Sequence, residues 1–109
     1  MVKLESAQLD DALHALADVN RRRLLQAICG KRACVTELAE AFDISLVAVS
    51  KHLKVLERAE LITRHKQGRS YFFSPVPATL DRVDALLEHY RAFWQGSFDR
   101  LEAALEADA

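Results

Sequence analysis

The chain has 109 residues, a mass of 12.3 kDa and a formal charge of −1, with 50% hydrophobic and 28% charged residues. This composition indicates one ordinary globular domain and excludes collagen-like, disordered and disulfide-stapled proteins. The longest unbroken apolar run extends from Leu46 to Val49, far short of the ~20 residues that a membrane helix needs. The N-terminus turns acidic where an export signal would turn apolar. We therefore expect a single cytoplasmic domain over residues 1–109, with no membrane partner.

Charge is unevenly distributed along the chain. Residues 21–34 carry five basic residues and no acid, and residues 45–70 carry six basic residues against two acids. Residues 1–20 and 71–109 are both acidic. A basic middle between acidic ends indicates an anion-binding face that the net charge conceals, although the same charges would also suit a plain solvated surface.

Three short helices are predicted before residue 43. The first has Ser6 as its N-cap, and the second follows Asp18 and stops at Gly30, which we expect in a left-handed conformation past the helix end. The third follows Cys34 at an N-cap position. Glu37 lies three residues later, where it completes a capping box.

The fourth predicted helix is the most informative. Ser45 is a natural N-cap, and Val49, Leu53 and Leu56 repeat at the spacing of a buried helical stripe. The opposite face is basic and hydroxylated. The joint that precedes this helix is so short that the third and fourth helices must cross sharply. Residues 35–59 are therefore predicted to form a helix-turn-helix.

The next segment, at about residues 61–74, predicts a β-hairpin. Residues 61–65 and 69–74 have β-forming side chains, and residues 66–68 provide the turn, with basic side chains around the tip. Two prolines end the second strand. A long helix is predicted over residues 79–106.

The apolar stripe of this last helix is larger than one small core can cover. A homodimer formed through the N- and C-terminal helices is its natural use. The predicted interface residues are Leu9, Leu13, Leu80, Val83, Leu87, Tyr90, Trp94 and Leu101.

The order of elements is that of a winged helix, a mainly α fold with a β-hairpin wing. Residues 15–28 and 34–74 resemble the ArsR/SmtB winged-helix repressors. The most specific matches are the Ser-x-His-Leu-x-x-Leu element at residues 50–56 and the wing tip at residues 66–69. The resemblance implies a cytoplasmic, homodimeric bacterial repressor that binds a palindromic operator in double-stranded DNA and is released by an inducer.

The fourth helix and the hairpin are expected to contact DNA. Val47 and Ala48 suit thymine methyl groups, and Ser50 and Lys51 suit the hydrogen-bonding edges of bases. The remaining basic residues suit phosphates, and contacts to phosphates make affinity fall with salt. His52 fits a structural hydrogen bond as well as a DNA contact. The predicted DNA-binding set is Ser45, Val47, Ala48, Ser50, Lys51, His52, Lys54, Arg58, Arg64, Lys66 and Arg69.

The usual metal sites of the resembling family are incomplete here. Cys34 matches one thiolate at the start of the third helix, but Thr36 and Ala39 stand where other ligands could be. A thiolate site for zinc or arsenic needs three or four ligands. The corresponding positions of the C-terminal helix hold no usual metal ligand either. They are occupied by Pro77, Thr79, Tyr90 and Phe93. We therefore expect no metal and no cofactor, and a metal(loid) response through Cys34 is only an alternative.

Two other signals stay open. Cys34 with Cys29 would form a thiol redox switch, because a helix N-terminus beside Lys31 and Arg32 favours a reactive thiolate. The simpler expectation, which we prefer, is that both cysteines are small buried hydrophobic residues. A small apolar inducer could instead bind an aromatic cluster on the last helix. The members of this cluster are Tyr90, Phe93, Trp94 and Phe98.

An enzyme is not expected. The sequence has no phosphate-binding glycine loop and no cluster of metal ligands or nucleophile partners. The remaining rival is a helical protein–protein adaptor whose basic face meets an acidic partner. Steep loss of affinity with salt would distinguish DNA binding from this alternative.

Overall fold

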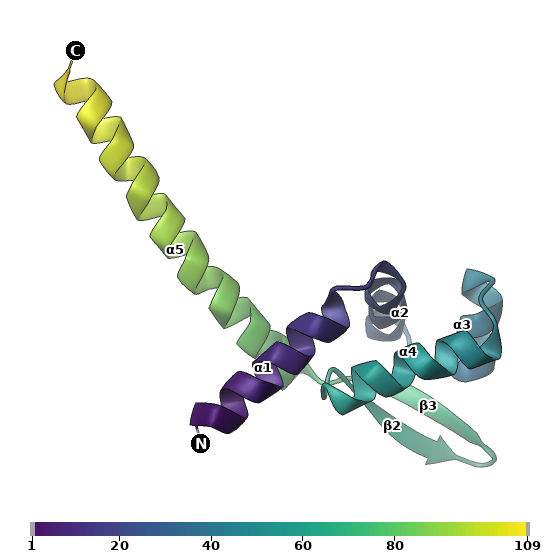
Figure 1. Cartoon of the computed structure of the whole chain (residues 1–109). Coiled ribbons are helices and arrows are strands. Elements are labelled where there is room, and N and C mark those ends of the chain that lie inside the picture. The colour runs from purple at the N-terminus through teal and green to yellow at the C-terminus, as the bar shows by residue number, and fades with distance from the viewer. Residues whose placement is uncertain (1, 109) are drawn as a thin grey trace.

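A computed structural model describes the backbone of residues 2–108 and the side chains of residues 7–108. In Figure 1, a long C-terminal helix projects from a body that contains the other elements, and the first helix crosses beside its base. The elements in chain order are α1 (Val2–Leu16), α2 (Val19–Gly30), β1 (Ala33–Cys34), α3 (Val35–Phe42), α4 (Leu46–Arg58), β2 (Ile62–Gln67), β3 (Ser70–Pro75) and α5 (Pro77–Ala107).

Side chains cap the second and fourth helices as predicted. The Asp18 carboxylate accepts the backbone N–H groups of Asn20 and Arg21 at 2.8 and 3.1 Å, at the start of α2. The Ser45 hydroxyl accepts the N–H of Ala48 at 3.1 Å, at the start of α4. Each cap pairs backbone donors that a helix N-terminus would otherwise leave without partners.

Two predictions about helix ends are wrong. Helix α1 begins at Val2, so Ser6 lies inside the helix and is not its N-cap. Gly30 is the last residue of α2, but the chain leaves it through Lys31 in an extended conformation, with φ −159°. The extended exit has a physical reason, because the chain must enter strand β1 within three residues. The left-handed helix end is found instead at Asp43, after α3, with φ 51°.

Strand β1 is an element that the sequence did not predict. It pairs antiparallel with β3, with Ala33 opposite Phe73, and completes a three-stranded sheet of order β1-β3-β2. A two-residue strand has no periodicity of its own and forms only because β3 offers it an edge.

The hairpin turn is tighter than predicted. Strand pairing continues to Gln67 opposite Ser70, so residues 66 and 67 belong to the strand, and only Gly68 and Arg69 connect the two strands. Gly68 has a φ of +65°, which is typical of the two-residue turns that match the twist of a hairpin. The predicted turn at residues 66–68 therefore began two residues too early and ended one residue too early.

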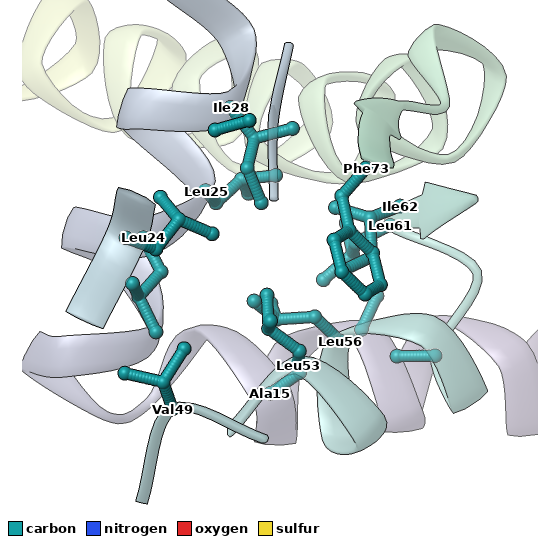
Figure 2. Packing of buried hydrophobic residues seen from close by; sticks show 14 of the residues in the cluster. Ala15, Leu24, Leu25, Ile28, Val49, Leu53, Leu56, Leu61, Ile62 and Phe73 are labelled. Carbon is teal, nitrogen blue, oxygen red and sulfur yellow. The ribbon is translucent and has the colours of Figure 1, made fainter. Parts of the chain in front are cut away.

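The hydrophobic core lies between α1, α2, α4 and the base of the hairpin (Figure 2). The predicted stripe of Val49, Leu53 and Leu56 on α4 is confirmed, since each is at most 2% exposed. Burying each such side chain contributes roughly 1.5–3 kcal/mol. The largest fully buried side chains are Leu24, Ile28, Leu53, Leu56, Leu61, Ile62 and Val49.

Helix α1 packs on the body mainly through two alanines. Ala12 and Ala15 are completely buried, whereas Leu13 is 38% exposed. Leu9 and Leu16 are partly buried beside them. Two alanines let the backbone of α1 approach the body closely, so the leucines flank the contact.

The base of α5 is fixed to the body. The buried Thr79 hydroxyl donates a hydrogen bond of 2.6 Å to the carbonyl of Glu60, just after α4. Val83, one turn later, is also buried in the core of its own chain. From Leu87 onward the large apolar side chains of α5 are exposed. Within residues 2–108, no helix combines the length and apolarity needed to cross a membrane.

Candidate nucleic-acid interface

The outward face of α4 is basic, as predicted. Lys51, Lys54 and Arg58 are exposed, and Val47 is 65% exposed near the start of the helix. The inward stripe of α4 fixes the orientation of this face, because residues at the remaining helical positions must point to solvent. Of the other predicted residues, Ser45 is exposed, and Ala48, Ser50 and His52 are half-buried.

The wing places two further cations near its tip. Lys66 and Arg69 are exposed, and no hydrogen bond or ion pair engages either side chain within residues 7–108. Arg64 is different. Its guanidinium pairs with Glu57 of α4 at 3.5 Å and stacks on the Tyr71 ring, 4.7 Å from the centroid.

A small cavity of about 110 Å³ separates α4 from the wing. Leu53 and Phe73 form part of its apolar floor, and Ser50, Lys54 and Arg64 contribute polar groups to its walls. Three of the predicted DNA-binding residues therefore meet around one hollow between α4 and the hairpin. Sequence reasoning did not select Glu57 or Tyr71, which join this group only through tertiary contacts.

Two basic residues of α2 hydrogen-bond the end of α1. Arg21 donates to the carbonyls of Ala15 and His14 at 2.7 and 3.1 Å, and Arg22 donates to the carbonyl of Leu16 at 2.7 Å. These bonds satisfy the C-terminal carbonyls of α1. The sequence left open whether the charges of residues 21–34 bind an anion, and the structure gives four of these five basic residues contacts inside the fold.

Two more arginines of the same segment lie on aromatic rings. Arg23 stacks on Phe42 with its Cζ 4.9 Å from the ring centroid, and Arg32 stacks on Phe72 at 4.8 Å. Stacking of this kind contributes about 0.5–1 kcal/mol at exposed sites. Their charges therefore help to hold helices and the sheet together.

The Asp18 carboxylate at the start of α2 has a lowered pKa. The backbone N–H of Arg21 is the main cause that holds the pKa of the Asp18 carboxyl below its usual value of 3.8. The N–H of Asn20 acts in the same direction, and positive charge on Arg21 and on His52 adds to it. His52 itself is half-buried beside the basic face of α4.

Comparison with known proteins identifies the family. The family model "Bacterial regulatory protein, arsR family" matches residues 18–64, from the cap of α2 to the middle of β2. The transcriptional repressor SdpR of Bacillus subtilis is 32% identical over 66 residues, which cover 61% of this chain and 73% of that protein. The chain belongs to the ArsR family.

Other relatives extend the match along the ArsR-family chain. The regulator NmtR of Mycobacterium tuberculosis is 36% identical over 100 residues, covering 91% of this chain and 83% of that protein. An ArsR-like regulator from Rhodococcus superposes with a TM-score of 0.74 at 29% identity, over 95% of this chain and 94% of that one. A homodimeric winged helix-turn-helix domain from Mycobacterium bovis shares the fold at 21% identity, with a TM-score of 0.65 over 79% and 80% of the two chains. The predicted winged helix-turn-helix fold and the function of a DNA-binding transcriptional regulator are therefore confirmed.

The two cysteines of this ArsR-family chain are free thiols, and Cys29 is exposed while Cys34 is half-buried. The preferred expectation that both are buried hydrophobic residues is therefore wrong. The Cys34 thiol donates to the Glu37 carboxylate at 3.1 Å, and its backbone N–H donates to the same oxygen at 3.3 Å. These two hydrogen bonds lower the pKa of Glu37, the thiol being the larger cause.

The expected surroundings of the Cys34 thiol also need correction. Arg32 does not lie beside it as an activating cation. Its guanidinium turns to the wing, where it donates to Gln67 at 2.7 Å. The charged group that contacts Sγ is the Glu37 carboxylate, which accepts a hydrogen bond from the thiol.

The aromatic cluster of α5 lies on an open surface. Tyr90, Phe93, Trp94 and Phe98 are each more than half exposed. The Trp94 ring lies 5.9 Å from Phe93 and 6.3 Å from Phe98, between ring centroids. Within residues 7–108, no three His, Cys, Asp or Glu side chains form a group that could hold a metal ion.

Proposed function

We propose that this chain is a homodimeric repressor that acts in the bacterial cytoplasm on a palindromic operator and is released by a signal. The observation that carries the proposal is the exposed basic face of α4 beside the free cations of the wing tip. A winged helix presents these two elements to the major groove and to the flanking backbone.

The proposed contacts divide by chemistry. Val47 and Ala48 meet thymine methyl groups, and Ser50 and Lys51 meet base edges. The half-buried His52 lies beside this group. The Ser45 oxygen already accepts the cap hydrogen bond, and its O–H donates to a phosphate oxygen. The proposed phosphate contacts are Lys54, Arg58, Arg64, Lys66 and Arg69.

Arg64 must leave its ion pair with Glu57 before its guanidinium can bind a DNA phosphate. Its ion pair with Glu57 is half exposed, and exposed pairs of this kind contribute only about 0–1 kcal/mol. A DNA phosphate that approaches the wing can therefore take over the guanidinium.

The dimer is supported by the exposed stripe of α5. Leu87, Tyr90, Trp94 and Leu101 are between 50% and 59% exposed in the isolated chain. Such a continuous apolar surface is typical of an interface. Leu9, Leu13 and Leu80 lie at its base, while Val83 has little surface left to offer. A two-fold dimer would set two α4 helices ~34 Å apart, which is the spacing of successive major grooves.

The test is fluorescence anisotropy with a labelled DNA fragment from upstream of the protein's own gene. We expect a linear fall of log K with log salt, with a slope of about −0.9 for each phosphate contacted. The double variant Lys51→Ala/Lys54→Ala should lose operator binding and remain dimeric. The control variant Arg82→Ala/Arg100→Ala removes the same charge from α5 and should bind as the wild type does.

Two outcomes would overturn the proposal. Normal binding by the Lys51→Ala/Lys54→Ala variant would show that α4 is not the recognition helix. Absence of DNA binding, together with capture of an acidic protein partner, would favour the helical adaptor.

A further inference from the structure

Arg32 makes two contacts with the wing. It follows α2 and immediately precedes β1. Its guanidinium lies over the Phe72 ring, 4.8 Å from the centroid, and its Nη2 donates to Oε1 of Gln67 at 2.7 Å. One side chain from the body of the protein thus contacts both strands of the hairpin, near its tip on β2 and along the middle of β3.

These contacts lie on the face of the wing that is turned away from α4. Side chains alternate between the two faces of a strand. Tyr71 and Phe73 line the cavity that faces α4, so Phe72 lies on the opposite face. Gln67 shares that opposite face through its pairing with Ser70. Arg32 therefore supports the wing from behind.

The distal half of the hairpin needs such support. Figure 1 shows the hairpin extending beyond the helices that pack on its base. The cavity of about 110 Å³ leaves a gap between α4 and the wing. Among the side chains of residues 7–108, the half-exposed Arg64–Glu57 pair is the one ion pair that bridges it. A hairpin that is not packed on both faces holds its angle weakly.

We propose that Arg32 is a positioning residue for the wing. It holds the hairpin at the angle at which Lys66 and Arg69 reach the DNA backbone, and it makes no DNA contact itself. This inference rests on the proposed DNA-binding function.

The test compares Arg32→Ala in two backgrounds by anisotropy with the same DNA fragment. In the wild-type background we expect binding to weaken about threefold to tenfold, because one stacking contact and one hydrogen bond are lost. In the Lys66→Ala/Arg69→Ala background, which lacks the tip cations, we expect a change smaller than about twofold, because residues that act through one another are not additive. An equal loss in both backgrounds would overturn the proposal, since Arg32 would then act without the wing tip.

The matched control is Lys31→Ala, which removes the same charge from the neighbouring position. It should change affinity less than about twofold, because surface charges without fixed partners contribute little. Gln67→Ala should reproduce part of the Arg32→Ala effect. A loss from Lys31→Ala as large as that from Arg32→Ala would show that loop charge matters and that the contact with the wing does not.

A measurement without DNA separates this inference from the proposed function. Amide hydrogen exchange in Arg32→Ala should become faster in the distal hairpin, residues 65–71, and stay unchanged in α2 and α4. Exchange that is unchanged in the hairpin, or faster everywhere, would overturn the positioning role. Failure of the wild-type protein to bind DNA would instead refute the proposed function.

Discussion

At the scale of single residues, charged side chains have very different uses in this protein. Arg21 and Arg22 neutralise the carbonyl end of α1, and Asp18 caps α2. Lys51 and Lys54 remain exposed on α4. Local sequence identifies a cap because the partner is two or three residues away. It does not distinguish a structural arginine from a DNA-binding one, since the partner is set by the fold.

Asp18 should make stability depend on pH. Its folded-state pKa lies below the usual 3.8, so its contribution is complete above that value and is lost as pH falls through the lower folded-state pKa. Asp18→Ala should lower the unfolding midpoint by a few degrees at pH 7, and should remove part of the loss of stability in acid. Asp18→Asn keeps the cap acceptor, so it should keep most of the stability at pH 7 without that pH dependence. Thermal unfolding, followed by circular dichroism at about five pH values between about 2.5 and 7, checks both variants.

Oxidation should leave DNA binding unchanged. The Cys34 thiol is hydrogen-bonded to the Glu37 carboxylate, and Arg32, the expected activating cation, contacts the wing instead. Thiol-reduced and peroxide-treated protein should therefore bind the labelled fragment equally in anisotropy titrations. If peroxide abolishes binding and Cys34→Ser or Cys29→Ser prevents the loss, a thiol switch operates after all.

At the scale of elements, the helix-turn-helix was predictable and the sheet was not. Ser45 and the α4 stripe are local signals with a period of their own. Strand β1 depends on pairing with residues far away in sequence, as Ala33 does with Phe73, whereas the exact turn of the wing is set by the pairing of Gln67 with Ser70. Strand pairing therefore added β1 to the sheet and moved the turn of the hairpin.

The wing turn should depend on Gly68. Its φ of +65° is costly for residues with a Cβ atom, so Gly68→Ala should destabilise the protein by about 1 kcal/mol. Gly68→Asn should cost less, because asparagine tolerates the left-handed region. Nothing lies within 4 Å of the added Cβ, so the effect would come from the backbone alone. Urea unfolding of the two variants provides the measurement, and equal stability of both with the wild type would contradict this origin.

At the scale of the whole molecule, α5 determines the shape. Its 31 residues correspond to a helix about 46 Å long, and the molecule measures 69 Å along its longest axis. Only the first turns of α5 are covered by the body, where Thr79 and Val83 are buried. The rest is an amphipathic helix that a single chain leaves uncovered, as expected for a subunit of a dimer.

Charge placed on the stripe should separate the subunits. Trp94→Glu/Leu101→Glu introduces two carboxylates at positions that are 59% and 56% exposed in the single chain and that a dimer would bury. Sedimentation should then report a monomer of about the 12.3 kDa chain mass. DNA affinity should fall more than about tenfold, because a monomer binds one half-site alone and loses the gain from binding two half-sites together. Ala92→Glu, on the polar side of the same helix, should remain dimeric. A wild-type protein that sediments as a monomer would refute the interface.

The sequence by itself determined the order of the helices and of the hairpin, the helix-turn-helix, the basic face of α4 and the apolar stripe of α5. Each of these follows from caps and periodicities within a few residues, or from the likeness of residues 15–28 and 34–74 to a known family. Only the tertiary structure decided where the arginines of residues 21–34 bind, which group contacts Cys34, and that Ala12 and Ala15 form the buried face of α1. Those outcomes depend on contacts between distant segments, such as Arg32 with Gln67, and no local pattern specifies which distant side chain will come within reach.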